Sequence, residues 1–151
     1  RNPSSNRFEQ PIPSGRSHML EKLYKNFILF WLPLILFCIV IFIMSSHPAP
    51  KHIPKVIHID KVLHFMGYAV LGILFFRALS TLPAISSIRL LITLSILFST
   101  FYGLSDEIHQ YFIPHRSSDV FDLLADALGS FSGIYIFYKI RGWKILPENP
   151  N

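Results

Sequence analysis

Four apolar runs dominate this chain, and each approaches the length of about 20 residues that a helix needs to cross a bilayer. Polar or Pro-rich segments separate them. In lipid, the backbone groups of such a run must be satisfied within the run itself, which favours a helix. We therefore expect an all-α integral membrane protein, a four-transmembrane-helix bundle over about Asn26–Met44, Asp60–Leu79, Ile88 to the residue before Pro114, and Asp119–Tyr138.

The composition argues for a membrane protein and against a soluble one. Hydrophobic residues make up 51% of the chain and charged residues 15%, whereas a soluble domain carries about 25% charged residues. The net charge of +5 does not indicate a nucleic-acid partner, because the basic residues stand singly between apolar runs. Anionic lipid head groups explain them better. The single cysteine, Cys38, lies inside the first run, which excludes a disulfide framework.

The polar ends of the sequence suggest three segments. Residues 1–18 are polar and rich in Pro and Ser, and Met19 follows directly. We interpret residues 1–18 as an expression-tag remnant, with Met19 as the native start. Residues 19–144 are predicted to form the transmembrane domain, and residues 145–151 a short polar tail.

The distribution of Lys and Arg predicts the orientation. Four helices place both termini on one side, and that side holds seven basic residues against four on the other. The positive-inside rule then predicts that both termini are cytoplasmic and that the loops at 45–59 and 113–118 face outward. The seven are Lys22, Lys25, Arg77, Arg89, Lys139, Arg141 and Lys144, and the four are Lys51, Lys55, Lys61 and Arg116.

This topology brings most of the acidic residues to the outer ends of three helices. At about 1.5 Å per residue they should share one depth within roughly 10 Å. Asp60, His64 and Tyr68 follow an i, i+4, i+8 spacing, so Asp60 is expected to orient His64. Asp106 is expected to point inward, and Glu107 toward a neighbouring helix. The full set is Asp60, His64, Asp106, Glu107, Gln110, Asp119, Asp122 and Asp126.

Structural explanations exist for several of these residues. Asp60 and Asp119 stand where helix N-caps are expected, and His64 could be a buried histidine satisfied by Asp60. Arg116 could pair with a phospholipid phosphate, and Tyr68 could be an interfacial aromatic. As a set, however, the acids together with His and Arg exceed what capping requires. Ionisable groups at membrane depth are costly, so the set predicts a polar functional site.

Two motifs resemble those of the VanZ-like family of small bacterial membrane proteins. They are "DKVLHFMGYAVLGILFFRA" and "SDEIHQYFIPHRSSDVFDLLADALG". The chain departs from the family pattern at Asp126, where Asn is common. The family positions that the resemblance carries over are Asp60, Lys61, His64, Tyr68, Asp106, Glu107, Gln110, Arg116, Asp122 and Gly129.

The resemblance implies a multi-pass protein of the bacterial cell membrane, associated with resistance to glycopeptide and lipoglycopeptide antibiotics of the teicoplanin type. It also implies partners among membrane lipids, and either a lipid-linked cell-wall precursor or the lipoglycopeptide itself. A suggested remote relationship to enzymes acting on lipid head groups would suit an acidic pocket at head-group depth.

Three functions stay open. In an enzyme acting on a lipid or polyprenyl-linked head group, His64, Asp60, Asp106 and Asp122 would be catalytic. The residues expected to bind substrate are Arg116, Glu107, Gln110, Tyr68 and Asp126. Alternatively, the protein binds and masks a membrane site without catalysis, or it is a small proton-coupled transporter, which the lack of inverted repeats disfavours. A divalent cation is compatible with the carboxylates, although no spacing confirms one.

Overall fold

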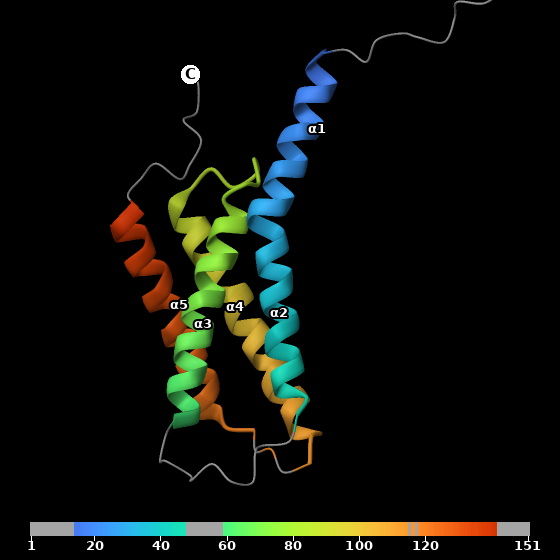
Figure 1. Cartoon of the computed structure of the whole chain (residues 1–151). Helices are drawn as coiled ribbons and strands as arrows, with labels where there is room; N and C mark the ends of the chain where they lie inside the picture. The colour runs from blue at the N-terminus through green and yellow to red at the C-terminus, as the bar shows by residue number, and fades with distance from the viewer. Residues whose placement is uncertain (1–13, 48–58, 115, 117, 142–151) are drawn as a thin grey trace, which may run out of the picture.

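The computed structural model describes residues 14–47, 59–114, 116 and 118–141, and within them every regular element is helical. Four helices are long and apolar enough to span a membrane, over Gly15–Ser45, Ile59–Leu79, Ile88–Tyr111 and Val120–Arg141. The expected four-helix bundle is thus confirmed (Figure 1). The elements are α1 (Ser14–Asn26), the π-helix η1 (Phe27–Trp31), α2 (Leu32–Ser45), α3 (Ile59–Leu79), α4 (Ile88–Tyr111) and α5 (Val120–Arg141).

The first span is longer than the apolar run and contains a π turn. It begins at Ser14, so residues 14–18 of the expected remnant are helical, while residues 1–13 and the predicted tail at 145–151 lie outside the described residues. Pro33 follows the π turn as the second residue of α2. Proline lacks an N–H and crowds the carbonyl four residues earlier, so the preceding turn widens. The N–H of Leu32 accordingly donates to the carbonyl of Phe27, five residues back.

The closest packing in the bundle is between α3 and α5. A Cβ at Gly129 would collide with the backbone carbonyl of Phe65, and one at Gly133 with that of Ala69. The small-xxx-small spacing in "GSFSG" therefore acts as such motifs do, because it lets two backbones approach. α4 packs against both α3 and α5, and α2 packs on α3 and α4. In Figure 1, α5 and α2 accordingly lie on opposite sides of the α3–α4 pair.

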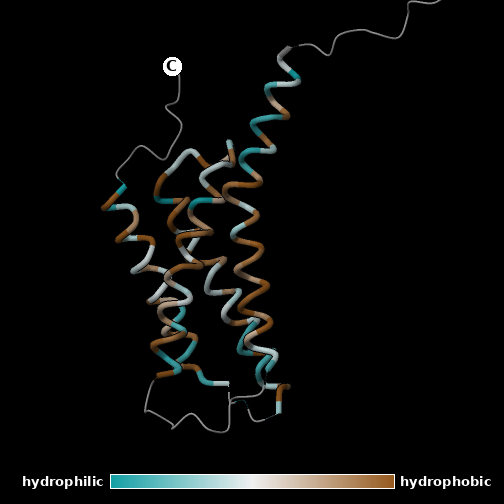
Figure 2. Tube along the Cα trace, in the orientation of Figure 1, coloured by the Kyte–Doolittle hydropathy of each residue, from teal (hydrophilic) through white to brown (hydrophobic). Residues whose placement is uncertain are grey.

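The outer surface of the bundle is apolar. Figure 2 shows hydrophobic residues along α2, and hydrophilic residues near the lower end of the bundle. Large hydrophobic side chains also stay exposed on the other helices, among them Leu63, Phe101 and Leu128. A continuous apolar exterior of this kind suits lipid rather than water.

The beginning of α3, the end of α4 and the beginning of α5 meet at the end of the bundle opposite α1 and the end of α5 (Figure 1). This is the end to which the sequence assigned the acidic residues. The beginning of α1 and the end of α5 therefore lie at the same end of the bundle, as four spans require.

Candidate functional site

The centre of the polar end is a hydrogen bond between α3 and α5. His64 Nδ1 lies 3.0 Å from Asp126 Oδ1. Asp126 is fully buried, and its second oxygen, Oδ2, lies against Gly103 of α4, where a Cβ would stand only 2.5 Å away. A carboxylate accepts, so Nδ1 carries the proton and Nε2 keeps its lone pair. Asp126 thus fixes the tautomer and the direction of the imidazole.

Asp60 does not orient His64, contrary to our expectation. Its side chain is 61% exposed and lies 3.6 Å from the ammonium of Lys61. Asp60 lies in the first turn of α3, at the edge of the bundle. Its carboxylate is solvated there and does not need a hydrogen bond from His64. Asp126 reaches His64 instead, because the glycine contacts of α5 bring its backbone close to α3.

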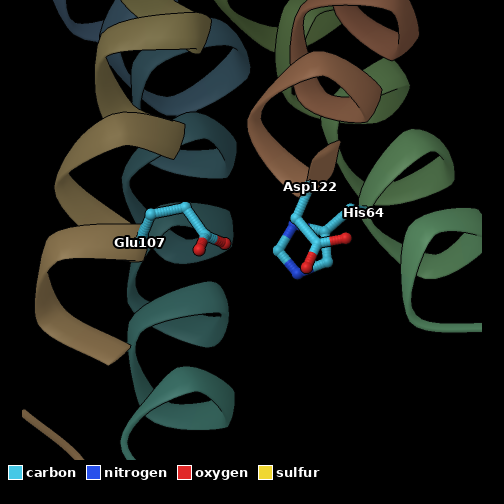
Figure 3. Close-up of side chains that lie close together, drawn as sticks. All are labelled: His64, Glu107 and Asp122. Atoms are coloured by element: carbon cyan, nitrogen blue, oxygen red, sulfur yellow. The ribbon is translucent and has the colours of Figure 1, made fainter. Parts of the chain in front are cut away.

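Glu107, Asp122 and His64 form a compact trio. Each offers one ligand-type atom, and these atoms all lie within 4.8 Å of one another. Figure 3 shows the Glu107 carboxylate reaching from α4 toward Asp122 and His64. Glu107 and Asp122 are 4% and 5% exposed, so both carboxylates are buried.

Glu107 is thus the acid of α4 in the trio with His64, whereas the sequence assigned Asp106 to the catalytic set and Glu107 to substrate binding. Asp106 is buried too, but its Oδ2 accepts a hydrogen bond from Gln110 Nε2 at 2.8 Å. The two acids are about 100° apart around α4. That separation lets one turn toward the trio while the other pairs with the residue one turn later.

Lys61 links three acids across the mouth of the site. Its Nζ donates to Asp119 Oδ2 at 2.7 Å and to Asp122 Oδ1 at 2.9 Å, with Asp60 at 3.6 Å. Sequence reasoning counted Lys61 only as a charge and a family position. Lys61 lies three residues before His64 and therefore on the same face of the helix, and this spacing could have indicated that it belongs to the site.

Asp119 is a cap as well as an ion-pair partner. Its Oδ1 accepts the backbone N–H of Phe121, and its backbone N–H donates to Glu107 Oε2, both at 2.9 Å. The ammonium of Lys61, followed by the Phe121 N–H, holds the pKa of Asp119 below its ordinary value of 3.8. The structural explanation of Asp119 as a capping residue is thus correct, and the cap also fixes Glu107.

Arg116 points to α2. Its guanidinium donates through Nη2 to the carbonyl of Met44 at 2.7 Å and through Nε to that of His47 at 3.1 Å. A cation at the last carbonyls of a helix complements the helix dipole. These contacts tie the segment between α4 and α5 to the end of α2, and phosphate binding by Arg116 stays a prediction.

Two hydroxyl groups behind the trio were not singled out from the sequence. Ser99 and Ser130 share a 2.7 Å hydrogen bond, and Ser130 also donates to the backbone, with Tyr68 O at 3.1 Å. Both serines are fully buried. Ser130 lies between the glycines of "GSFSG". A polar residue inside a helix-packing motif could have indicated a buried hydrogen bond there.

The bundle also has a hollow of about 360 Å³, at the end opposite the trio. It has no ionisable side chain in its lining, so it offers no acid–base chemistry. The lining residues are Leu23, Asn26, Phe27, Trp31, Thr81, Leu82 and Pro83. The trio with Asp126 and Lys61 is therefore the candidate site.

A sequence model of the VanZ/LLP1 family matches residues 27–142. The chain belongs to the VanZ/LLP1 family. Comparison with curated proteins and with solved structures finds no match. The matched range contains every residue of the candidate site, so this polar end is part of the VanZ/LLP1 domain itself. It also lies inside the range predicted for the domain, 19–144.

We expect Lys61→Met to lower the unfolding temperature of this VanZ/LLP1 protein, because the change leaves Asp119 and the buried Asp122 without their cation. Since the pKa of Asp119 is depressed in the folded state, its contribution is present above about pH 4 and is lost only as the pH falls through the lowered pKa. Thermal unfolding in detergent at pH 7 measures the effect.

Lys25→Met is the matched control for this prediction. Lys25 pairs with Glu21 at 2.7 Å, but both side chains are more than half exposed. Such a surface pair contributes roughly 0–1 kcal/mol. An equal shift for the two variants would contradict the structural role given to Lys61.

Proposed function

We propose that this protein acts on a phosphate-bearing lipid head group at the outer face of the bacterial cell membrane, and so confers resistance to antibiotics of the teicoplanin type. The observation that carries the proposal is the pair of the buried Asp126 with the half-buried His64, close to Glu107 and Asp122. Membership of the VanZ/LLP1 family supports the membrane setting. The substrate class would be a phospholipid or a polyprenyl-linked cell-wall precursor.

The geometry suits proton transfer. With Nδ1 bound to Asp126, His64 Nε2 can accept a proton from water or from a substrate hydroxyl. The carboxylate of Asp126 stabilises the imidazolium that forms, as an acid behind a catalytic histidine does. Glu107 and Asp122 stand on the same side as acceptors or donors for the reacting group. Asp60, by contrast, has no part in this proposal.

The lipid environment supports a head group as the target. The polar end is formed by the ends of α3, α4 and α5, whose outer faces carry exposed apolar side chains. A lipid whose tails lie beside the bundle brings its head group to this depth. A soluble substrate would not benefit from such a placement.

The test is resistance in cells at matched membrane abundance. Cells producing His64→Ala should show the teicoplanin susceptibility of cells without the protein, and their lipid extracts should lack any head-group change that the wild type causes. The wild type should cause both. Resistance without any change in the extracted lipids would favour the alternative of a masking protein, and full resistance of His64→Ala would refute the proposal.

The orientation has its own test. In a Cys38→Ser background, a cysteine at the exposed Ser118 should react with a membrane-impermeant maleimide in intact cells, because the acidic end is proposed to face outward. A cysteine at the exposed Glu21, near the cytoplasmic end, should react only after lysis. The reverse labelling pattern would place the site in the cytoplasm and contradict the predicted orientation.

A further inference from the structure

The trio has a carboxylate oxygen that the protein does not satisfy. Glu107 Oε2 accepts the N–H of Asp119, but Glu107 Oε1 makes no hydrogen bond within the described residues, although the residue is only 4% exposed. A buried carboxylate oxygen without a partner costs free energy comparable to several hydrogen bonds. Figure 3 shows this carboxylate directed at Asp122 and His64.

The other two members of the trio each keep one ligand atom that the hydrogen bonds described above do not use. His64 is bound through Nδ1, which leaves Nε2 for a ligand. The hydrogen bond from Lys61 goes to Oδ1 of Asp122, which leaves Oδ2. One nitrogen of His64 and one carboxylate oxygen each of Glu107 and Asp122 thus lie within 4.8 Å of one another.

The charge balance of the site also calls for a cation. Four carboxyl groups are buried at this end, in Asp106, Glu107, Asp122 and Asp126. In the described part of the chain, the ammonium of Lys61 pairs with one of the four, Asp122, and it is shared with Asp60 and Asp119. The guanidinium of Arg116 is engaged at the end of α2. An anionic head group would meet only repulsion here unless a further positive charge lay between it and the acids.

We propose that His64, Glu107 and Asp122 bind a divalent cation, with Asp126 holding His64 as an outer hydrogen-bond partner. A metal-bound histidine commonly donates its other N–H to a carboxylate, which fixes the ring and strengthens the ligand. The Asp126–His64 contact has this arrangement. Glu107 and Asp122 would then be ligands of the cation. The cation would supply the positive charge that attracts a phosphate.

The donor set selects the type of ion. The imidazole nitrogen favours Zn²⁺ over Ca²⁺ and Mg²⁺, which prefer oxygen ligands throughout, and the two carboxylates also suit Mn²⁺. Ligands about 2.1 Å from a tetrahedral ion lie about 3.4 Å apart, whereas the present atoms lie within 4.8 Å of one another. The side chains thus close by roughly 1 Å on the ion, and three side chains leave a coordination position open for a water or a head-group oxygen.

The experiment measures metal binding by itself, on the full chain purified in detergent and stripped with a chelator. Titration with Mn²⁺, followed by loss of the free-ion signal in electron paramagnetic resonance, should show one saturable site that Zn²⁺ competes for. Glu107→Gln and Asp122→Asn should weaken binding by more than the roughly 10–100-fold that loss of an outer partner costs, and Asp126→Asn by about that amount.

Asp60→Asn is the matched control, since it removes one negative charge from the same end of the bundle, and it should bind like the wild type. Each variant is compared at equal monodispersity, and Glu107→Gln retains an acceptor for the Asp119 N–H. No saturable binding by the wild type would overturn the site, as would equal binding by wild type and Glu107→Gln. Because this readout needs no antibiotic and no lipid, its failure is distinct from failure of the proposed function.

Discussion

In this chain, which has Asp126 where Asn is common in the family, Asp126→Asn should reduce resistance while Asp60→Asn leaves it intact. Asn keeps an oxygen that accepts the His64 N–H, so the hydrogen bond and the packing at Asp126 survive. The neutral amide no longer stabilises an imidazolium, and the same change in a Ser-His-Asp triad costs about 10⁴-fold in rate because the amide favours the wrong histidine tautomer. General-base catalysis as a whole contributes about 10²–10⁴-fold, so we expect a loss within that range. Susceptibility to teicoplanin in cells, at matched abundance, gives the readout.

The Asp60 variant is the decisive control because it makes the same chemical change one helical turn before His64. Its carboxylate is exposed and its contact with Lys61 is at 3.6 Å. If Asp60→Asn lost resistance and Asp126→Asn retained it, the orienting role would belong to Asp60. If both variants retained it, His64 would not act as a base.

Gly129→Ala and Gly133→Ala should each destabilise the bundle. A single methyl group at either position would overlap a backbone carbonyl of α3, that of Phe65 or of Ala69, and a backbone cannot rotate away as a side chain can. The two helices must then separate, at an expected cost of about 1–3 kcal/mol in the free energy of unfolding. Since α3 and α5 carry His64 and Asp126, the same separation should lengthen that contact and weaken resistance.

Gly67→Ala provides the comparison in α3. A Cβ at Gly67 would meet nothing within 4 Å, so the change should stabilise the helix by about 0.5–1 kcal/mol through helix propensity. The measurement is the fraction of monodisperse protein that survives heating in detergent. If Gly133→Ala were as stable as Gly67→Ala, the close approach of α3 and α5 would be refuted.

The fold could be predicted from the sequence because the length of an apolar run determines whether it can span a membrane as a helix. This length can be read from each run without knowing how the helices pack. The bounds of α3 and α4 agree with the sequence prediction closely, since Asp60 and Ser87 mark polar starts. The first helix begins earlier, at Ser14, because polar residues can extend a helix beyond an apolar run. The π turn depends on a local clash with Pro33 that a search for apolar runs does not detect.

The depth of the site residues was predictable, but which of them pair was not. Depth along each helix follows from residue counting, which is why His64, Glu107 and Asp122 were expected at one level. Which acid meets His64 depends instead on the rotation of α5 and its distance from α3, and the glycine contacts set both. The spacing within α3 favoured Asp60 as the partner of His64. Contacts between residues of one helix follow from their spacing in the sequence, whereas contacts across a helix interface do not.

Gly103 of α4 and Asp126 of α5 limit the size of each other's side chain. The carboxylate of Asp126 occupies the volume that any side chain at position 103 would need, with the ring of Tyr68 at its border. A larger residue at 103 and a carboxylate at 126 thus exclude each other, whatever their separate effects on activity. Across the VanZ/LLP1 family the two positions should therefore covary. Because the side chains of Asn and Asp have the same shape, family members with either residue at position 126 should have glycine at position 103.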